Sequence, residues 1–101
     1  MGSAKAAMDR SVAYLAHWLA PKGVRVNGVC CGPVDTPTVR EMLTPDELDL
    51  LAESMTKKTL AGRMAQADDI AGVVAMLCSD ESRWIYGQVI LADGGEELLR
   101  G

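Results

Sequence analysis

Two short runs of apolar, β-branched residues lie far apart in the sequence, and helical segments fill the stretch between them. Residues 24–30 and residues 88–92 have the length and composition of strands. Strands that are joined through helices need a crossover connection, so they pair in parallel, and such crossovers are right-handed. The order of the elements therefore predicts an α/β architecture.

The first helical segment covers residues 3–20 and carries a broad apolar surface. Two neighbouring stripes of apolar side chains run along it at helical spacing, which predicts burial on two sides. Pro21 and Gly23 end the segment, because proline cannot continue a helix and glycine accepts a left-handed conformation. The stripes are formed by Met8, Val12, Leu15 and Leu19, and by Ala7, Tyr14 and Trp18.

Two further helices are predicted between the strands. Thr44 and Glu47 are spaced as a capping box, in which each side chain bonds the backbone amide of the other, and this predicts a helix start. A second apolar periodicity covers residues 67–79. Directly after the first strand, the pairs Gly32-Pro33 and Thr36-Pro37 predict a loop.

The composition is that of a globular chain and excludes several classes of protein. Among 101 residues, 49% are apolar and 24% are charged, which is close to the average for folded domains. The net charge of −4 disfavours a nucleic-acid-binding protein, because contact with phosphates needs clustered positive charge. We find no apolar run long enough to cross a bilayer and no signal peptide, so we expect no membrane partner and a cytoplasmic location.

The cysteines and the single histidine limit the chemistry that the chain can carry. Cys30 and Cys31 are adjacent and Cys78 stands alone, so no disulfide framework is predicted. His17 is the one histidine and no Cys-x-x-Cys pair occurs, so no metal site is predicted. Reduced, mostly buried thiols agree with a cytoplasmic location.

Several short segments, taken in their order and spacing, resemble one known family. They are residues 3–7 (SAKAA), 23–27 (GVRVN), 32–37 (GPVDTP), 62–63 (GR), 68–71 (DDIA) and 87–95 (GQVILADGG). Together they resemble the C-terminal portion of the short-chain dehydrogenase/reductase family. The resemblance implies part of a doubly wound, Rossmann-like parallel sheet, here two strands and about three helices. Residues 1–101 would then form a single partial domain of a dinucleotide-binding fold.

The resemblance also implies roles for four residues beside NAD or NADP. Lys5 would hydrogen-bond the ribose hydroxyls and lower the pKa of a catalytic tyrosine, since a nearby cation favours a phenolate. Gly32, Val34 and Thr36 would contact the nicotinamide carboxamide and the pyrophosphate. Without the resemblance, Lys5 is a solvated lysine of the first helical turn, and the segment containing Gly32 is a turn between a strand and a helix.

Parts of the family's catalytic and cofactor machinery do not occur among these 101 residues. There is no Gly-x-x-x-Gly-x-Gly turn to cradle the pyrophosphate and no counterpart of the catalytic serine. Met1 stands where the tyrosine belongs, and a thioether has no proton to exchange, so the role of Lys5 is at most vestigial. We therefore expect a truncated oxidoreductase of this family that is not catalytic alone and binds no cofactor tightly. Whether the chain is an enzyme stays open at this point.

Two alternative functions are kept beside this interpretation. The chain could be a non-catalytic, homo-oligomeric interaction module on the same scaffold, or an oxidoreductase that another chain completes. A two-stranded sheet leaves an apolar edge exposed, and such surfaces usually find a partner. We expect a homo-oligomer that forms through the first helix and this strand edge.

Three other polar residues are expected to hold the structure together. The resemblance implies that Asn27 holds the backbone near the first strand, and Asp93 is expected to fix the Gly-Gly turn that follows it. Arg63 is expected to pair with a carboxylate near a helix start.

Overall fold

The computed structural model describes residues 2–100, which divide into two compact units. Unit 1 lies within residues 1–30 and 72–91, and unit 2 within residues 31–71 and 92–101. Each unit contains a pair of neighbouring strands, β1 with β4 and β2 with β3. In chain order the elements are α1 (Gly2–Leu19), the 3-10 turn η1 (Ala20–Lys22), β1 (Gly28–Cys31), β2 (Val34–Asp35), α2 (Pro37–Met42), α3 (Pro45–Lys58), β3 (Ala65–Gln66), α4 (Ala67–Leu77), the 3-10 turn η2 (Asp80–Ser82), β4 (Val89–Ala92) and α5 (Glu96–Leu99).

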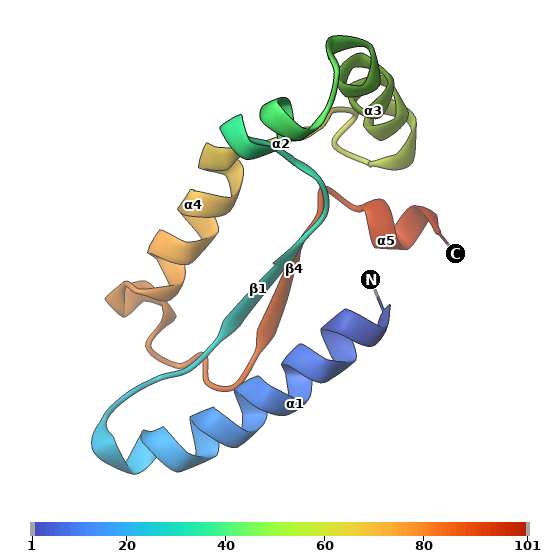
Figure 1. Cartoon of the computed structure of the whole chain (residues 1–101). Helices are drawn as coiled ribbons and strands as arrows, with labels where there is room; N and C mark the ends of the chain where they lie inside the picture. Colours follow the sequence, from blue (N-terminus) through green and yellow to red (C-terminus); the bar gives the residue numbers. More distant parts are fainter. Residues whose placement is uncertain (1, 101) are drawn as a thin grey trace. The chain divides into compact units, whose positions relative to one another are not determined.

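In unit 1, helix α1 lies along the β1–β4 pair, whose strands run in the same direction (Figure 1). The close approach depends on Gly28: a Cβ there would lie 3.2 Å from the sulfur of Met8 and from a methyl group of Val12. Val12 and Ala16 are the buried residues of the helix, at 7% and 8% exposure. The parallel pair and the long first helix confirm the α/β architecture that the sequence predicts.

The first strand is shorter than predicted, because it begins at Gly28 rather than at residue 24. The residues before it are bonded through side chains instead of a regular ladder. Asn27 donates to the carbonyl oxygen of Ile85 at 3.0 Å and accepts from the backbone N–H of Gln88 at 3.0 Å. This confirms the structural role predicted for Asn27.

Arg25 is the second side chain that ties the segment before β1 to the rest of unit 1. Its half-buried guanidinium donates to four carbonyl oxygens, at distances of 2.9–3.4 Å. These oxygens lie between the last residue of α4 and the segment after η2, and each of them also accepts a second hydrogen bond. The four oxygens belong to Leu77, Ser79, Ser82 and Ile85.

In unit 2, the short strands β2 and β3 pair in parallel, with Val34 opposite Ala65 and Asp35 opposite Gln66. Helix α3 begins with the predicted capping box. Thr44 accepts from the backbone N–H of Glu47 at 3.2 Å, and Glu47 accepts from that of Thr44 at 2.9 Å.

The predicted loop between Gly32 and Pro37 is only partly irregular. Residues 34–35 form β2, and Thr36 with Pro37 begins helix α2 instead of breaking the chain. Thr36 is the N-cap, and its hydroxyl oxygen accepts from the backbone N–H of Val39 at 3.3 Å. Proline suits the first turn of a helix, since the amide that it lacks would have no helical partner there. The sequence does not predict β2, because a strand of two residues is too short to show a periodicity.

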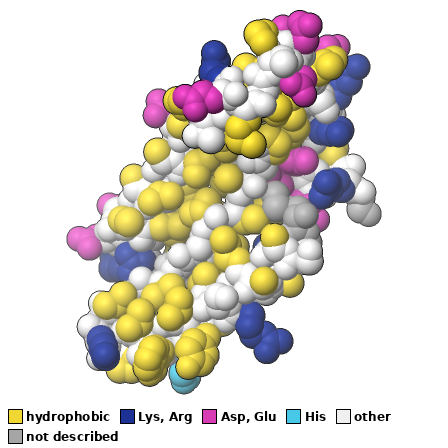
Figure 2. All heavy atoms as spheres, in the orientation of Figure 1, with side chains coloured by type: hydrophobic (Ala, Val, Ile, Leu, Met, Phe, Trp, Pro, Cys, Tyr) yellow, Lys and Arg dark blue, Asp and Glu magenta, His cyan; other side chains and the backbone are white. Residues whose placement is uncertain are grey.

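The second apolar stripe of α1, which contains Tyr14 and Trp18, is exposed in the described part of the chain, although the sequence pattern predicts burial of the helix on two sides. Tyr14 and Trp18 are each 67% exposed, and their rings lie with centroids 6.2 Å apart. Figure 2 shows hydrophobic side chains gathered over the C-terminal part of this helix. Among residues 2–100, no helix combines the length and apolar character needed to cross a bilayer.

Candidate functional site

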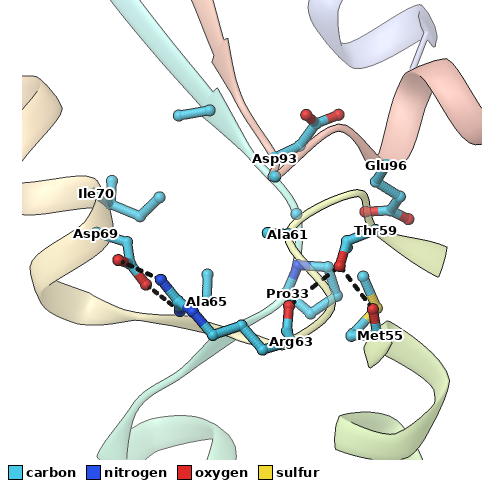
Figure 3. A pocket seen from close by; sticks show the side chains of 13 residues that line it. Pro33, Met55, Thr59, Ala61, Arg63, Ala65, Asp69, Ile70, Asp93 and Glu96 are labelled. Carbon is cyan, nitrogen blue, oxygen red and sulfur yellow. Dashed lines mark hydrogen bonds and ion pairs between the residues drawn. The ribbon is translucent and has the colours of Figure 1, made fainter. Parts of the chain in front are cut away.

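Unit 2 contains a pocket of about 210 Å³, and Figure 3 shows the side chains that line it. Its apolar wall consists of small and medium side chains from several elements. Four charged side chains and one hydroxyl supply its polar groups. The apolar group includes Pro33, Met55, Ala61, Ala65 and Ile70, and the polar group is Thr59, Arg63, Asp69, Asp93 and Glu96.

Gly32 lies against the carboxylate of Glu96 in this pocket. A Cβ at residue 32 would be 2.6 Å from Oε2 of Glu96, which is closer than real Cβ atoms approach an oxygen. The same Oε2 is buried and has no hydrogen-bond partner among the described residues. At this site the backbone of Gly32 therefore lies close to the side chain of Glu96, and Oε2 of Glu96 is a hydrogen-bond acceptor without a donor.

Asp93 holds the turn that leads from β4 to α5. One of its oxygens accepts from the backbone N–H of Gly95 at 2.9 Å, and the other accepts from that of Glu97 at 2.9 Å. Gly94 and Gly95 both adopt positive φ values, 65° and 88°, which glycine reaches without a steric penalty. This geometry confirms that Asp93 fixes the Gly-Gly turn.

Arg63 and Asp69, which both line the pocket, form an ion pair with two hydrogen bonds of 2.6 and 2.9 Å (Figure 3). Asp69 lies in the first turn of α4 and also accepts from the backbone N–H of Gln66 at 2.8 Å. Hydrogen bonds from Arg63 first, then from that amide, hold the pKa of Asp69 far below its ordinary value. The structure thus confirms that Arg63 pairs with a carboxylate near a helix start.

Thr59 is a buried pocket residue that sequence reasoning does not single out. Its hydroxyl lies 2.8 Å from the carbonyl oxygen of Met55, to which it donates, and it accepts from the backbone N–H of Gly62 at 3.0 Å. The bond to Met55 satisfies a carbonyl at the end of α3. A threonine directly after a helix is common in sequences, so the pattern carries no specific signal.

Val34 and Thr36 lie on the same segment as Gly32 but outside the pocket lining. Val34 belongs to β2, and Thr36 caps α2. Between them, Asp35 accepts two hydrogen bonds of 2.7 Å from Arg40 of α2. These bonds lower the pKa of Asp35 and raise that of Arg40. The ion pair therefore links the last turn of α2 to the end of β2.

Lys5 lies on α1 in unit 1, whereas the other three predicted site residues lie in unit 2. Its ammonium group pairs with Asp9, one turn further along the helix, at 3.1 Å. The Lys5 side chain is 34% exposed. Met1, which stands at the position of the family's tyrosine, lies outside the described residues.

Residues 1–97 match a protein-family model described as enoyl-(acyl carrier protein) reductase. Among curated relatives, the NADH-dependent enoyl-acyl-carrier-protein reductase of Aquifex aeolicus is 35% identical over 99 residues. That alignment covers 98% of this chain and 36% of the relative. The chain therefore spans little more than a third of the length of the protein that it matches.

Two solved structures extend the likeness to the fold. A short-chain dehydrogenase/reductase from Caenorhabditis elegans, solved with its cofactor, superposes with a TM-score of 0.82 at 32% identity, over 94% of this chain and 37% of that one. An angucycline C-6 ketoreductase with bound NADP superposes with a TM-score of 0.76 at 30% identity, over 96% of this chain and 36% of that one. Family model, relatives and fold agree, and the chain belongs to the short-chain dehydrogenase/reductase family.

Proposed function

We propose that this chain supplies the nicotinamide-side portion of an NAD(P)-dependent oxidoreductase and does not catalyse hydride transfer by itself. The observation that carries the proposal is the arrangement of the segment from Gly32 to Thr36. Gly32 lines a pocket. The residues that follow it are held in place, because β2 pairs with β3 and Thr36 caps α2. A cofactor-contacting segment needs such support, because a small displacement of a binding group costs much of its effect.

The residues around Gly32 fit the nicotinamide end of the cofactor better than its phosphates. The pocket presents apolar walls beside the carboxylate of Glu96, which suits a flat ring better than an anionic phosphate. When bound, the nicotinamide accepts or donates the hydride. Thr36, outside the pocket, keeps its hydroxyl proton for an oxygen acceptor, because its cap bond uses only the oxygen.

Lys5 supports the same proposal through the number of its donors. An ammonium group has three N–H donors, and the contact with Asp9 leaves others for the ribose hydroxyls. The resemblance gives Lys5 a positioning role, and moving the proton of the reaction is a separate task. In the family that task belongs to the tyrosine, and residue 1 is Met here.

The proposal predicts what the purified chain does with NADH and NADPH. Native mass spectrometry with micromolar chain and nucleotide should show no retained cofactor, and nicotinamide absorbance should stay constant with carbonyl or enoyl substrates. The physical reason is that these 101 residues contain no Gly-rich turn to hold the pyrophosphate. Turnover by the chain alone would overturn the non-catalytic part of the proposal.

A second candidate function is assembly, either with copies of itself or with a chain that completes the site. The exposed pair of Tyr14 and Trp18 supports it, because aromatic side chains in a contiguous exposed patch usually mark an interface. In the described residues each strand has a single neighbour, so strand edges are also open to a partner. We propose that assembly uses α1 and a strand edge, in the cytoplasm.

A further inference from the structure

The pocket below Gly32 carries an excess of negative charge. One guanidinium, that of Arg63, faces three carboxylates, those of Asp69, Asp93 and Glu96. The formal charge of the lining at neutral pH is therefore negative. A phosphate would be repelled from such a pocket, whereas a cation would be attracted.

Two of the three carboxylates already have protein partners. Asp69 is neutralised by Arg63, and Asp93 accepts from two backbone amides. The unmet demand is that of Glu96, whose buried Oε2 has no donor among residues 2–100. A buried carboxylate oxygen without a donor is costly, so a positive charge in the pocket near Glu96 is favourable, through space rather than by contact with the covered Oε2.

The size of the pocket limits that ligand to a single ring. Sites for drug-sized molecules occupy roughly 300–1,000 Å³, and this pocket has about 210 Å³. The oxidised nicotinamide ring is such a ligand, because it is a single pyridinium ring that carries a positive charge and a carboxamide. The reduced dihydropyridine ring has almost the same shape and no charge, so charge is what separates the two forms.

We propose that Glu96 makes the pocket below Gly32 discriminate between oxidised and reduced nicotinamide by charge, in favour of the oxidised ring. The inference rests on the proposed function, because it assumes that the segment containing Gly32 meets the nicotinamide. Glu96 acts here as a specificity-determining residue, and its contact with Gly32 sets where the charge lies. On its other side Glu96 borders a second hollow with Lys57, Lys58 and Arg100, none of which bonds to it in the described chain.

The test uses two small probes, so that the missing pyrophosphate turn does not matter. The whole chain is titrated with 1-methylnicotinamide, a cation, and with 1-methyl-1,4-dihydronicotinamide, its neutral reduced form, and binding is followed by amide chemical shifts in NMR spectra. The unaltered chain should bind the cation about five- to tenfold more tightly, as one partly screened charge contact allows. Rising salt should reduce that ratio.

Two substitutions separate the charge of Glu96 from its packing. Glu96→Gln keeps the shape and should bring the ratio of the two affinities close to one, mainly by weakening cation binding. The matched control is Glu97→Gln, which removes the same charge from an exposed neighbour paired with Arg100 at 3.9 Å, and it should leave the ratio unchanged. If Glu96 had only a structural role, Glu96→Gln would weaken the binding of both probes equally.

The possible results distinguish this inference from the proposed function. Equal binding of both probes to the unaltered chain, or an unchanged ratio in Glu96→Gln, overturns the role of Glu96 and leaves the nicotinamide placement standing. If neither probe shifts the amides around Gly32, both are overturned, because the segment then does not meet the ring. A lowered ratio in Glu96→Gln alone supports the inference.

Discussion

The guanidinium of Arg63 donates two hydrogen bonds to the carboxylate of Asp69, at 2.6 and 2.9 Å. Asp69 also caps the start of α4 by accepting from the backbone N–H of Gln66. The pair thus links the segment before β3 to the first turn of α4, directly beside the pocket. Because both side chains are well exposed, we expect the pair to fix geometry more than to add stability.

Asp69 makes the stability of the chain depend on acid. Its pKa is lowered in the folded state from an ordinary value of 3.8, mainly by Arg63. Its contribution to the free energy of unfolding is therefore complete above the ordinary value and is lost as the pH falls below it. Urea unfolding should show Asp69→Asn to be less stable than the unaltered chain at pH 7, and the difference should shrink at pH 3.

The control for this prediction is Asp68→Asn, which removes the same charge one residue earlier in the first turn of α4. Asp68 takes no part in the pair with Arg63, so its substitution should change stability less at pH 7. A gap between Asp69→Asn and the unaltered chain that is as large at pH 3 as at pH 7 would contradict the linkage.

The capping box of α3 should have a measurable effect on stability. Thr44→Ala removes the acceptor for the backbone N–H of Glu47 and should lower the free energy of unfolding by about 1 kcal/mol. Thr44→Ser keeps a hydroxyl oxygen at the same place and should recover most of that loss. Equal losses in the two variants, measured by urea unfolding, would show that the methyl group matters and the cap does not.

Arg25 should be the polar side chain whose loss is most damaging in unit 1. Arg25→Met removes the charged donor from four carbonyl oxygens, each of which keeps another donor, and should cost roughly 1.5–3 kcal/mol in the free energy of unfolding. Arg25→Lys should recover little, because an ammonium cannot reproduce the planar fork. Arg83→Ala, which removes an exposed arginine bonded to the carbonyl of Asp80, is the matched control and should be nearly neutral.

Two glycines should respond to alanine with opposite signs. Gly28→Ala forces a methyl group against Met8 and Val12 at 3.2 Å and should destabilise unit 1 by about 1–3 kcal/mol. Gly72 lies inside α4 with open space around its Cβ position, so Gly72→Ala should stabilise the chain by about 0.5–1 kcal/mol. Thermal unfolding of the two variants tests the packing of α1 on β1, and equal shifts would contradict it.

The aromatic pair on α1 should control assembly. If α1 forms the interface, light scattering after size exclusion should show an assembly for the unaltered chain and a smaller species for Tyr14→Ser with Trp18→Ser. Trp84→Ser removes a tryptophan that is 92% exposed outside α1, and it should leave the assembly intact. A monomeric unaltered chain at micromolar concentration would rule out assembly of the chain with itself.

Local interactions were readable from the sequence because they depend on fixed spacings along the chain. Thr44 and Glu47 are three residues apart, which is the spacing that a capping box needs, and both bonds form. Gly23 ends the first helical stretch at a φ of 77°, as a left-handed C-terminal glycine does. The turn held by Asp93 follows from the same kind of short-range geometry.

Contacts between residues far apart in the sequence could not be read in the same way. The carboxylate of Glu96 meets Gly32, and Arg25 reaches carbonyls more than fifty residues further along the chain. No spacing rule connects such residues, since only the folded backbone brings them together. The strands β2 and β3 are two residues long, and they exist because Val34 and Ala65 are held opposite each other by the surrounding fold.

The sequence by itself determined the α/β class, the helix ends and the resemblance to one family, since periodicity, caps and motif order are local properties of the chain. The tertiary structure alone decided which charges face the pocket, which helix face stays exposed, and that Thr36 begins a helix. These features depend on long-range packing, whose free energy outweighs the weak local preferences of single residues.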